Sequence, residues 1–230
     1  MKPLLIHVPH ASRYIPRDYM KTALIPIEEV EEENRFMCDT GVVEFIPMTF
    51  REDTLIFPYS RLYCDVERFR DESEVLAKYG MGFVYTHDSK GREIFRPTKE
   101  HIKEVEAIYD QHHAEFNWRV ESILEECGHC LIVDLHSFSD EVVERMFGIT
   151  DAPDVCIGTD ENTHTEDIVQ GIESICRGLG LSTRRNYPYS GTFVPNAYYG
   201  KPDTGITSVM IEINKRVLEK NKYVSFPKYS

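Results

Sequence analysis

The 230-residue sequence has no apolar run long enough to span a membrane. The apolar stretch at the N-terminus stops at His7, which makes it too short for the core of a signal peptide. An excess of positive charge is also lacking, since the formal net charge is -13 at pH 7. Nucleic acids and anionic membranes attract basic surfaces, so this charge argues against both as partners. We expect a cytoplasmic protein, and an acidic one can still bind a small anion through a few buried arginines.

Repeats, low-complexity segments and Pro/Gly/Ser-rich linkers are absent as well, so we expect one domain over residues 1–230. The six cysteines are scattered, unlike the dense frameworks of small secreted proteins, and predict reduced thiols. Cys127 and Cys130 form a C-x-x-C pair. The pair follows a helical pattern and precedes a strand, whereas a thioredoxin-like motif belongs at a strand-to-helix turn. Ordinary buried cysteines are the favoured interpretation, and a thiol redox protein is the alternative.

Secondary-structure patterns alternate between strands and helices. Short apolar runs predict buried strands at Leu4–Val8, Thr54–Phe57, Leu131–Leu135, Val155–Gly158 and Ser208–Ile213. Helical spacing predicts helices from Thr98 to Gly128 and from Thr163 to Gly178. The acidic residues from Glu28 to Glu33 lead into a third helical stretch near Val42–Ile46. This order predicts an α/β fold, a three-layer α/β/α sandwich with a mixed, mostly parallel sheet.

Ligands bind at the carboxyl ends of the strands in such sheets, and three polar residues are expected there. His10 follows the first strand, Arg61 the second and His136 the third. A histidine after a strand end can bind a metal or act as a base, but a structural, hydrogen-bonded histidine is the commoner case for His10 alone. We assign no functional role to His7, which lies within the first strand.

Several carboxylates are candidates for the same site. Asp134 and His136 are two residues apart on a strand and point to the same face, so Asp134 could orient His136 or another ligand; capping the next loop is the alternative. Asp39 opens a helical stretch, and taken alone it is better explained as an N-cap than as a ligand. Glu212 lies inside an apolar strand, which suits either a general base or half of a buried ion pair.

Two further segments carry less specific patterns. Arg61 and Arg68 flank Asp65 and Glu67, and an arginine fork suits carboxylate recognition, although a surface ion-pair cluster would look the same. The Tyr/Gly/Pro-rich segment from Asn186 to Gly200 is too apolar for a plain solvent loop, so it either forms the wall of a pocket or covers the core.

Taken together and in order, these segments resemble the N-formylglutamate amidohydrolase family. The matching features are Pro9-His10-Ala11-Ser12, Asp39, Ser60-Arg61 with Asp65 and Arg68, Asp134-Leu135-His136-Ser137, Gly158-Thr159, Gly191 with Tyr199-Gly200, and Glu212. The resemblance extends over nearly the whole chain. It implies a fold like that of the zinc-dependent exopeptidases.

The resemblance implies a divalent metal, most simply zinc, held by His10, Asp39 and His136. The chain departs from the His-x-x-Glu pattern of carboxypeptidases because Arg13 stands three residues after His10, so the carboxylate ligand is expected from Asp39. Glu212 would act as general base, and Arg61 would stabilise the oxyanion.

The expected substrate is a small anionic N-acyl amino acid, with N-formyl-L-glutamate as the first candidate. The residues expected to bind it are Arg68, Arg184, Arg185, Tyr189 and Thr192. A deacylase or carboxypeptidase-like enzyme for another N-acyl amino acid is one alternative. A catalytically inactive binding protein of the same fold is another.

Overall fold

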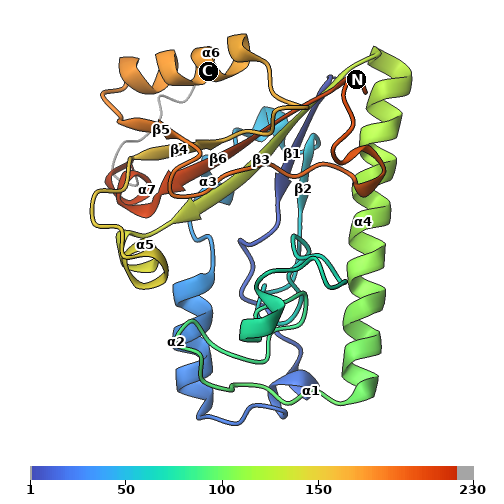
Figure 1. The fold of residues 1–230 in the computed structure, drawn as a ribbon, viewed down its shortest axis with the longest axis vertical. Helices are drawn as coiled ribbons and strands as arrows, with labels where there is room; N and C mark the ends of the chain where they lie inside the picture. The colour runs from blue at the N-terminus through green and yellow to red at the C-terminus, as the bar shows by residue number, and fades with distance from the viewer. Residues whose placement is uncertain (1, 222–230) are drawn as a thin grey trace.

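The computed structural model describes residues 2–221, and its centre is a six-stranded sheet (Figure 1). The strand order is β2-β1-β3-β6-β4-β5. The strands are β1 (Leu4–Val8), β2 (Thr54–Ile56), β3 (Cys130–Phe138), β4 (Val155–Gly158), β5 (Thr183–Arg185) and β6 (Ile206–Asn214). All neighbouring strands are parallel except β4 and β6, which are antiparallel. The prediction of a mixed, mostly parallel sheet is therefore confirmed.

Helices cover both faces of this sheet. The helices within residues 2–221 are α1 (Arg17–Met20), α2 (Ile27–Met37), α3 (Val42–Phe45), α4 (Lys99–Cys127), α5 (Asp140–Phe147), α6 (Glu166–Gly178) and α7 (Lys215–Asn221), of which α1 and α2 lie beyond the sheet. Short 3-10 turns lie at Met48–Phe50, Ala77–Tyr79 and Asn196–Tyr198. Side chains alternate along β3, so Ile132 packs in one cluster with Phe116 of α4, while Leu135 packs on the other face with Val42 of α3 and Leu218 of α7. The sheet is the middle layer of three.

A second hydrophobic core lies beyond the sheet. In Figure 1, α4 extends well past the strands toward α1 and α2. Tyr19 of α1 and Val30 of α2 pack with Val105 of α4 and with Tyr63 and Phe95 from the coil-rich segment between β2 and α4. The segment that follows β1 contributes Ile15 and Tyr19 to this core, so the second core lies beside the carboxyl end of β1.

Most predicted elements are present, with different boundaries. The strands β1 and β4 have the predicted bounds, whereas β3 continues to Phe138, so His136 lies within the strand and not after it. The acidic residues from Glu28 to Glu33 are themselves part of α2. The helix α6 begins at Glu166, and strand β5 was not predicted. The two ends of the predicted domain, residues 1 and 230, lie outside the described residues.

The cysteines have the predicted character. Cys38, Cys64, Cys130, Cys156 and Cys176 are buried thiols that form no disulfide. Cys130 starts β3, so the C-x-x-C pair is not at a strand-to-helix turn. No helix within residues 2–221 combines the length and hydrophobicity that a membrane span needs.

Candidate active site

A cavity of about 310 Å³ lies at the carboxyl end of β1 and along the ends of β3 and β6. It gathers most of the side chains singled out in the sequence, namely His10, Asp39, Arg61, Arg68, Asp134, His136, Tyr189, Thr192 and Glu212. These residues are far apart in the chain, and the parallel strand arrangement brings them to one place.

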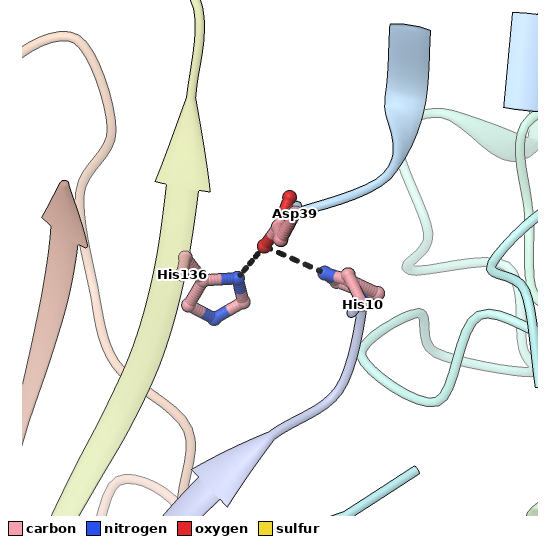
Figure 2. A group of neighbouring side chains, drawn as sticks. All are labelled: His10, Asp39 and His136. Carbon is pink, nitrogen blue, oxygen red and sulfur yellow. Dashed lines mark hydrogen bonds and ion pairs between the residues drawn. The ribbon is translucent and has the colours of Figure 1, made fainter. Parts of the chain in front are cut away.

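His10, Asp39 and His136 all line this cavity and are buried. Figure 2 shows the two imidazoles turned toward the Asp39 carboxylate. Asp39 Oδ2 lies 3.0 Å from His136 Nδ1 and 3.9 Å from His10 Nδ1. Two ligand atoms on one tetrahedral zinc ion, each at about 2.0–2.1 Å, lie roughly 3.3 Å apart. The observed spacing brackets that value, so two imidazoles and one carboxylate are arranged as a three-ligand metal site would require.

Asp39 does not cap a helix. The N-cap position of α3 is Gly41, whose left-handed backbone (φ 93) suits glycine, and no side chain caps that helix. The Asp39 backbone N–H instead donates to the His10 carbonyl at 2.9 Å, which ties the two candidate ligands together. The N-cap interpretation of Asp39 is wrong, and the ligand interpretation remains.

The far nitrogen of each histidine faces a carboxylate. His10 Nε2 is 2.8 Å from Asp65 Oδ1, and His136 Nε2 is 3.2 Å from Asp134 Oδ1. Metal-binding histidines commonly give their second ring N–H to a carboxylate, which fixes the tautomer and leaves the other nitrogen for the metal. His10 Nδ1 is buried and has no hydrogen-bond partner among the described residues, so its lone pair is available. The residues present therefore fit a divalent metal.

The protonation states of His136 and Asp39 depend on the charged groups around them. Burial alone would lower the pKa of His136, but the carboxylates of Glu67 and Asp134 raise it well above its ordinary value. Burial would raise the pKa of Asp39, yet the hydrogen bond from His136 lowers it. Without metal, His136 and Asp39 therefore form a buried ion pair. A metal ligand must be deprotonated, so metal binding would release the proton of His136.

Asp65 connects His10 to Arg61 and Arg68. Its carboxylate is fully buried and accepts hydrogen bonds from Arg61 at 2.8 and 3.2 Å and from Tyr85 at 3.2 Å. Burial would raise the pKa of Asp65, but Arg61 and Arg68 hold it well below its usual range. The interpretation of this segment as a surface ion-pair cluster is wrong, since Asp65 is the buried partner of His10.

Two buried histidines, His7 and His112, form a series of hydrogen bonds that ends at the Asp134 carboxylate. His7 Nδ1 is 3.0 Å from Asp134 Oδ1, and His7 Nε2 is 2.9 Å from His112 Nε2 of α4. Burial lowers the pKa of His112 to about 2, so this imidazole is neutral. The sequence analysis gave His7 no role because the register that pairs it with Asp134 cannot be derived from residue spacing.

Glu67 is a second residue that the sequence analysis did not assign. Its Oε2 lies 3.6 Å from His10 Nδ1 and its Oε1 lies 3.4 Å from His136 Nε2. The Oε1 atom is buried and forms no hydrogen bond in the part of the chain that the structure describes. Glu67 therefore adds negative charge directly beside the two candidate metal ligands, which strengthens the site for a cation.

Glu212 lies on β6 opposite His136, on the cavity face of the sheet. Its side chain is buried, and Oε2 has no hydrogen-bond partner within the described residues. Burial and the nearby Asp39 raise the pKa of Glu212 to about 8. The carboxyl group is thus uncommitted and adjacent to the histidine ligands, as a group that exchanges protons with substrate should be.

The arginines divide into two groups. Arg61 and Arg68 line the cavity, but Arg184 and Arg185 do not. Arg184 pairs with Asp151 on the surface, and Arg185 pairs with Glu166 and Glu173 of α6. Both lie on edge strand β5, which the sequence did not reveal, so we propose no substrate role for them.

The loop after β5 forms the opposite wall of the cavity. The Tyr189 ring contacts Phe138 and Phe147, with ring centroids 5.7 and 5.6 Å apart. Thr192 Oγ1 is 2.6 Å from Ser208 Oγ of β6, which anchors the loop to the sheet. The structure thus brings both predicted loop residues to the cavity.

Comparisons with known proteins agree with this arrangement. The family model described as N-formylglutamate amidohydrolase matches residues 2–218. The fold is similar to the crystal structure of N-formylglutamate amidohydrolase from Ralstonia eutropha JMP134, with a TM-score of 0.79 and 23% identity over 93% of this chain and 82% of that one. A gene product of Agrobacterium tumefaciens is also similar, with a TM-score of 0.67 and 20% identity over 94% of this chain and 82% of that one. Among curated proteins, no relative matches the sequence.

Proposed function

The chain belongs to the N-formylglutamate amidohydrolase family, and we propose that it hydrolyses the amide bond of an N-acyl amino acid with the help of a divalent metal. N-formyl-L-glutamate, giving formate and L-glutamate, is the first candidate substrate. The observation that carries the proposal is the buried triad of His10, Asp39 and His136 beside the uncommitted carboxyl of Glu212.

The metal would be held by His10, Asp39 and His136, with zinc as the first choice. Two imidazoles and one carboxylate leave a coordination position open for water or substrate in catalytic zinc sites. When bound, such a metal lowers the pKa of its water to about 7 and polarises the substrate carbonyl. The hydrogen bond to Asp65 holds the ring of His10 in place, and the Asp134 carboxylate lies at ion-pair distance from His136 Nε2.

The remaining steps belong to the side chains of the cavity. Glu212 takes the proton of the attacking water and then gives it to the departing amine. Arg61 stabilises the developing oxyanion, because its contacts with Asp65 leave part of its five-donor fork free. Arg68, whose Nε forms no hydrogen bond to the described residues, binds the substrate's α-carboxylate, and Tyr189 and Thr192 shape the wall.

One observation keeps a second substrate class open. Apolar side chains such as Phe36, Met37 and Met146 also line the cavity, and they suit an N-acyl amino acid with an apolar side chain. A panel of N-formyl and N-acetyl amino acids separates the two. Location in the cytoplasm and a role in amino-acid catabolism are part of the same proposal and rest on the composition and on the family.

The role of Glu212 is tested by Glu212→Gln, which keeps the shape of the side chain and removes the base. Zinc binding should persist, while kcat falls about a hundredfold or more, the scale expected of a general base. Glu33→Gln is a matched control, because Glu33 is also a buried carboxyl but binds Ser89 outside the cavity. Near-normal turnover in the Glu212 variant would sink the assignment.

A further inference from the structure

The cavity contains a third cation, Lys215, that neither the sequence analysis nor the steps above use. We infer that Lys215 binds the side-chain carboxylate of a dicarboxylic N-acyl amino acid and so sets the preference for glutamate. This inference rests on the proposed hydrolysis of an N-acyl amino acid.

The position of Lys215 is the first support. It is the first residue of α7, directly after β6, and it lines the same cavity as Glu212 and Asp39. Its Nζ donates to the Cys38 carbonyl at 2.7 Å, which places the ammonium beside the peptide that precedes Asp39. The side chain is therefore fixed close to the candidate metal ligands.

The second support is that Lys215 has no anionic partner. Within residues 2–221, no carboxylate lies within the 4.0 Å of an ion pair from its Nζ, although the cavity is rich in carboxylates. An ammonium group has three donors, and one is used by the Cys38 carbonyl. By contrast, the adjacent Arg216 is paired with both Asp140 and Asp154. Lys215 thus has donors and charge to offer a ligand.

The other cations of the cavity are already assigned. Arg61 is bound to Asp65 through two nitrogens. Arg68 Nε lies 3.6 Å from the same carboxylate and forms no hydrogen bond within residues 2–221. Arg68 can take one substrate carboxylate, which leaves Lys215 for a second. Arg184 and Arg185, which the sequence suggested for this task, lie elsewhere.

Electrostatics explains why a second cation is needed. The cavity is lined by Asp39, Glu67 and Asp134, so an additional carboxylate would be repelled unless a positive charge offset it. Arg68 lies next to Asp65, the partner of His10, whereas Lys215 lies next to Asp39. A substrate whose amide carbonyl reaches the triad can therefore direct its two carboxylates to different cations.

The experiment compares N-formyl-L-glutamate with N-formyl-L-glutamine, which has nearly the same shape but an amide in place of the side-chain carboxylate. Zinc-loaded wild type should prefer the glutamate substrate in kcat/KM. In Lys215→Met, that preference should fall about tenfold to a hundredfold, the range for losing one hydrogen bond to a charged group. Lys215→Arg should retain most of the preference. Lys103→Met, at an exposed lysine of α4, should leave it unchanged.

The outcomes are distinguishable. An unchanged glutamate-to-glutamine preference in Lys215→Met overturns the inference, and so does an equal loss of both activities, which indicates a structural role. If the Met variant does not fold, Lys215→Gln provides the same comparison. A wild type that prefers apolar N-formyl amino acids overturns the inference but keeps the hydrolase. A wild type that cleaves no N-acyl amino acid overturns the proposed function itself.

Discussion

Replacement of Asp65 by asparagine should weaken zinc binding without removing any zinc ligand. The Asp65 carboxylate is fully buried. It is hydrogen-bonded to His10 Nε2 at 2.8 Å and to Arg61 at 2.8 Å. Asparagine has the same shape but no charge, so His10 loses the carboxylate that fixes its tautomer and raises the basicity of Nδ1. Arg61 and Arg68 also lose their shared anion.

Two magnitudes follow. Loss of a carboxylate behind a metal-bound histidine typically costs about tenfold to a hundredfold in metal affinity. Breaking a buried ion pair by removing one partner destabilises a protein by about 3–5 kcal/mol. The Asp65→Asn variant should therefore show both effects, with a tenfold or greater rise in the zinc Kd at a pH where it is still folded.

The assay is a zinc titration of metal-free protein against a chromogenic chelator, with urea unfolding at the same pH. Asp88→Asn is a matched control: Asp88 is 1% exposed and, like Asp65, pairs with an arginine four residues away, but it lies outside the cavity. It should keep the wild-type zinc Kd. A folded Asp65→Asn protein with wild-type zinc affinity would refute the view that this carboxylate supports His10.

Two further predictions concern stability. Burial lowers the pKa of His113 to about 4. Below about pH 6.5 the unfolded chain therefore takes up a proton at this histidine, whereas the folded chain does not. The free energy of unfolding should fall as the pH drops from 6.5 to 4. The free energy of unfolding falls by about 1.4 kcal/mol per pH unit. Urea unfolding of His113→Gln should depend less on pH than that of the wild type, whereas His129→Gln, at an exposed histidine, should keep the wild-type dependence. In Gly158→Ala, the new Cβ would clash with the Gly191 carbonyl, which should cost about 1–3 kcal/mol in urea unfolding. Gly171→Ala, with open space around it, should cost nothing; equal effects of the two glycine substitutions would contradict this reading.

Local patterns were sufficient for the buried strands and long helices. Strands β1 and β4 are continuous apolar runs with clear stops, and Pro9 ends the first of them. Strand β3 was predicted to end at Leu135 because His136 and Ser137 are polar. These residues extend the strand because they pair with β6, and they are polar because they face the cavity. Strand β5 was missed because it is a short polar edge strand.

The candidate site could be predicted only in part, because its residues contact partners that are distant in the sequence. Residue types at strand ends identified His10, His136 and Glu212, and family resemblance added Asp39. The partners of these residues depend on contacts between distant segments: Asp65 lies 55 positions from His10, and Asp39 lies 97 positions from His136. No spacing rule connects such pairs, so the supporting roles of Asp65, His7, Glu67 and Lys215 required the structure.

The residues that bind the substrate could also be predicted only in part from the sequence. Arg184 and Arg185 had the right chemistry for carboxylates, but the edge position of β5 directs them to acidic partners on the surface. Lys215 had no distinguishing pattern in the sequence. Its significance lies in its surroundings, because it lines a cavity rich in carboxylates and forms no ion pair with any residue from 2 to 221.

The metal content of the purified protein tests the central claim most directly. Wild type, His10→Ala, His136→Ala and the control His113→Ala should be measured after incubation with zinc and removal of the excess. The account predicts about one zinc per chain in the wild type and the control, as a three-ligand site would hold, and loss of that zinc in both ligand variants. A wild-type protein that retains no metal would contradict the proposed chemistry and favour a binding protein of the same fold.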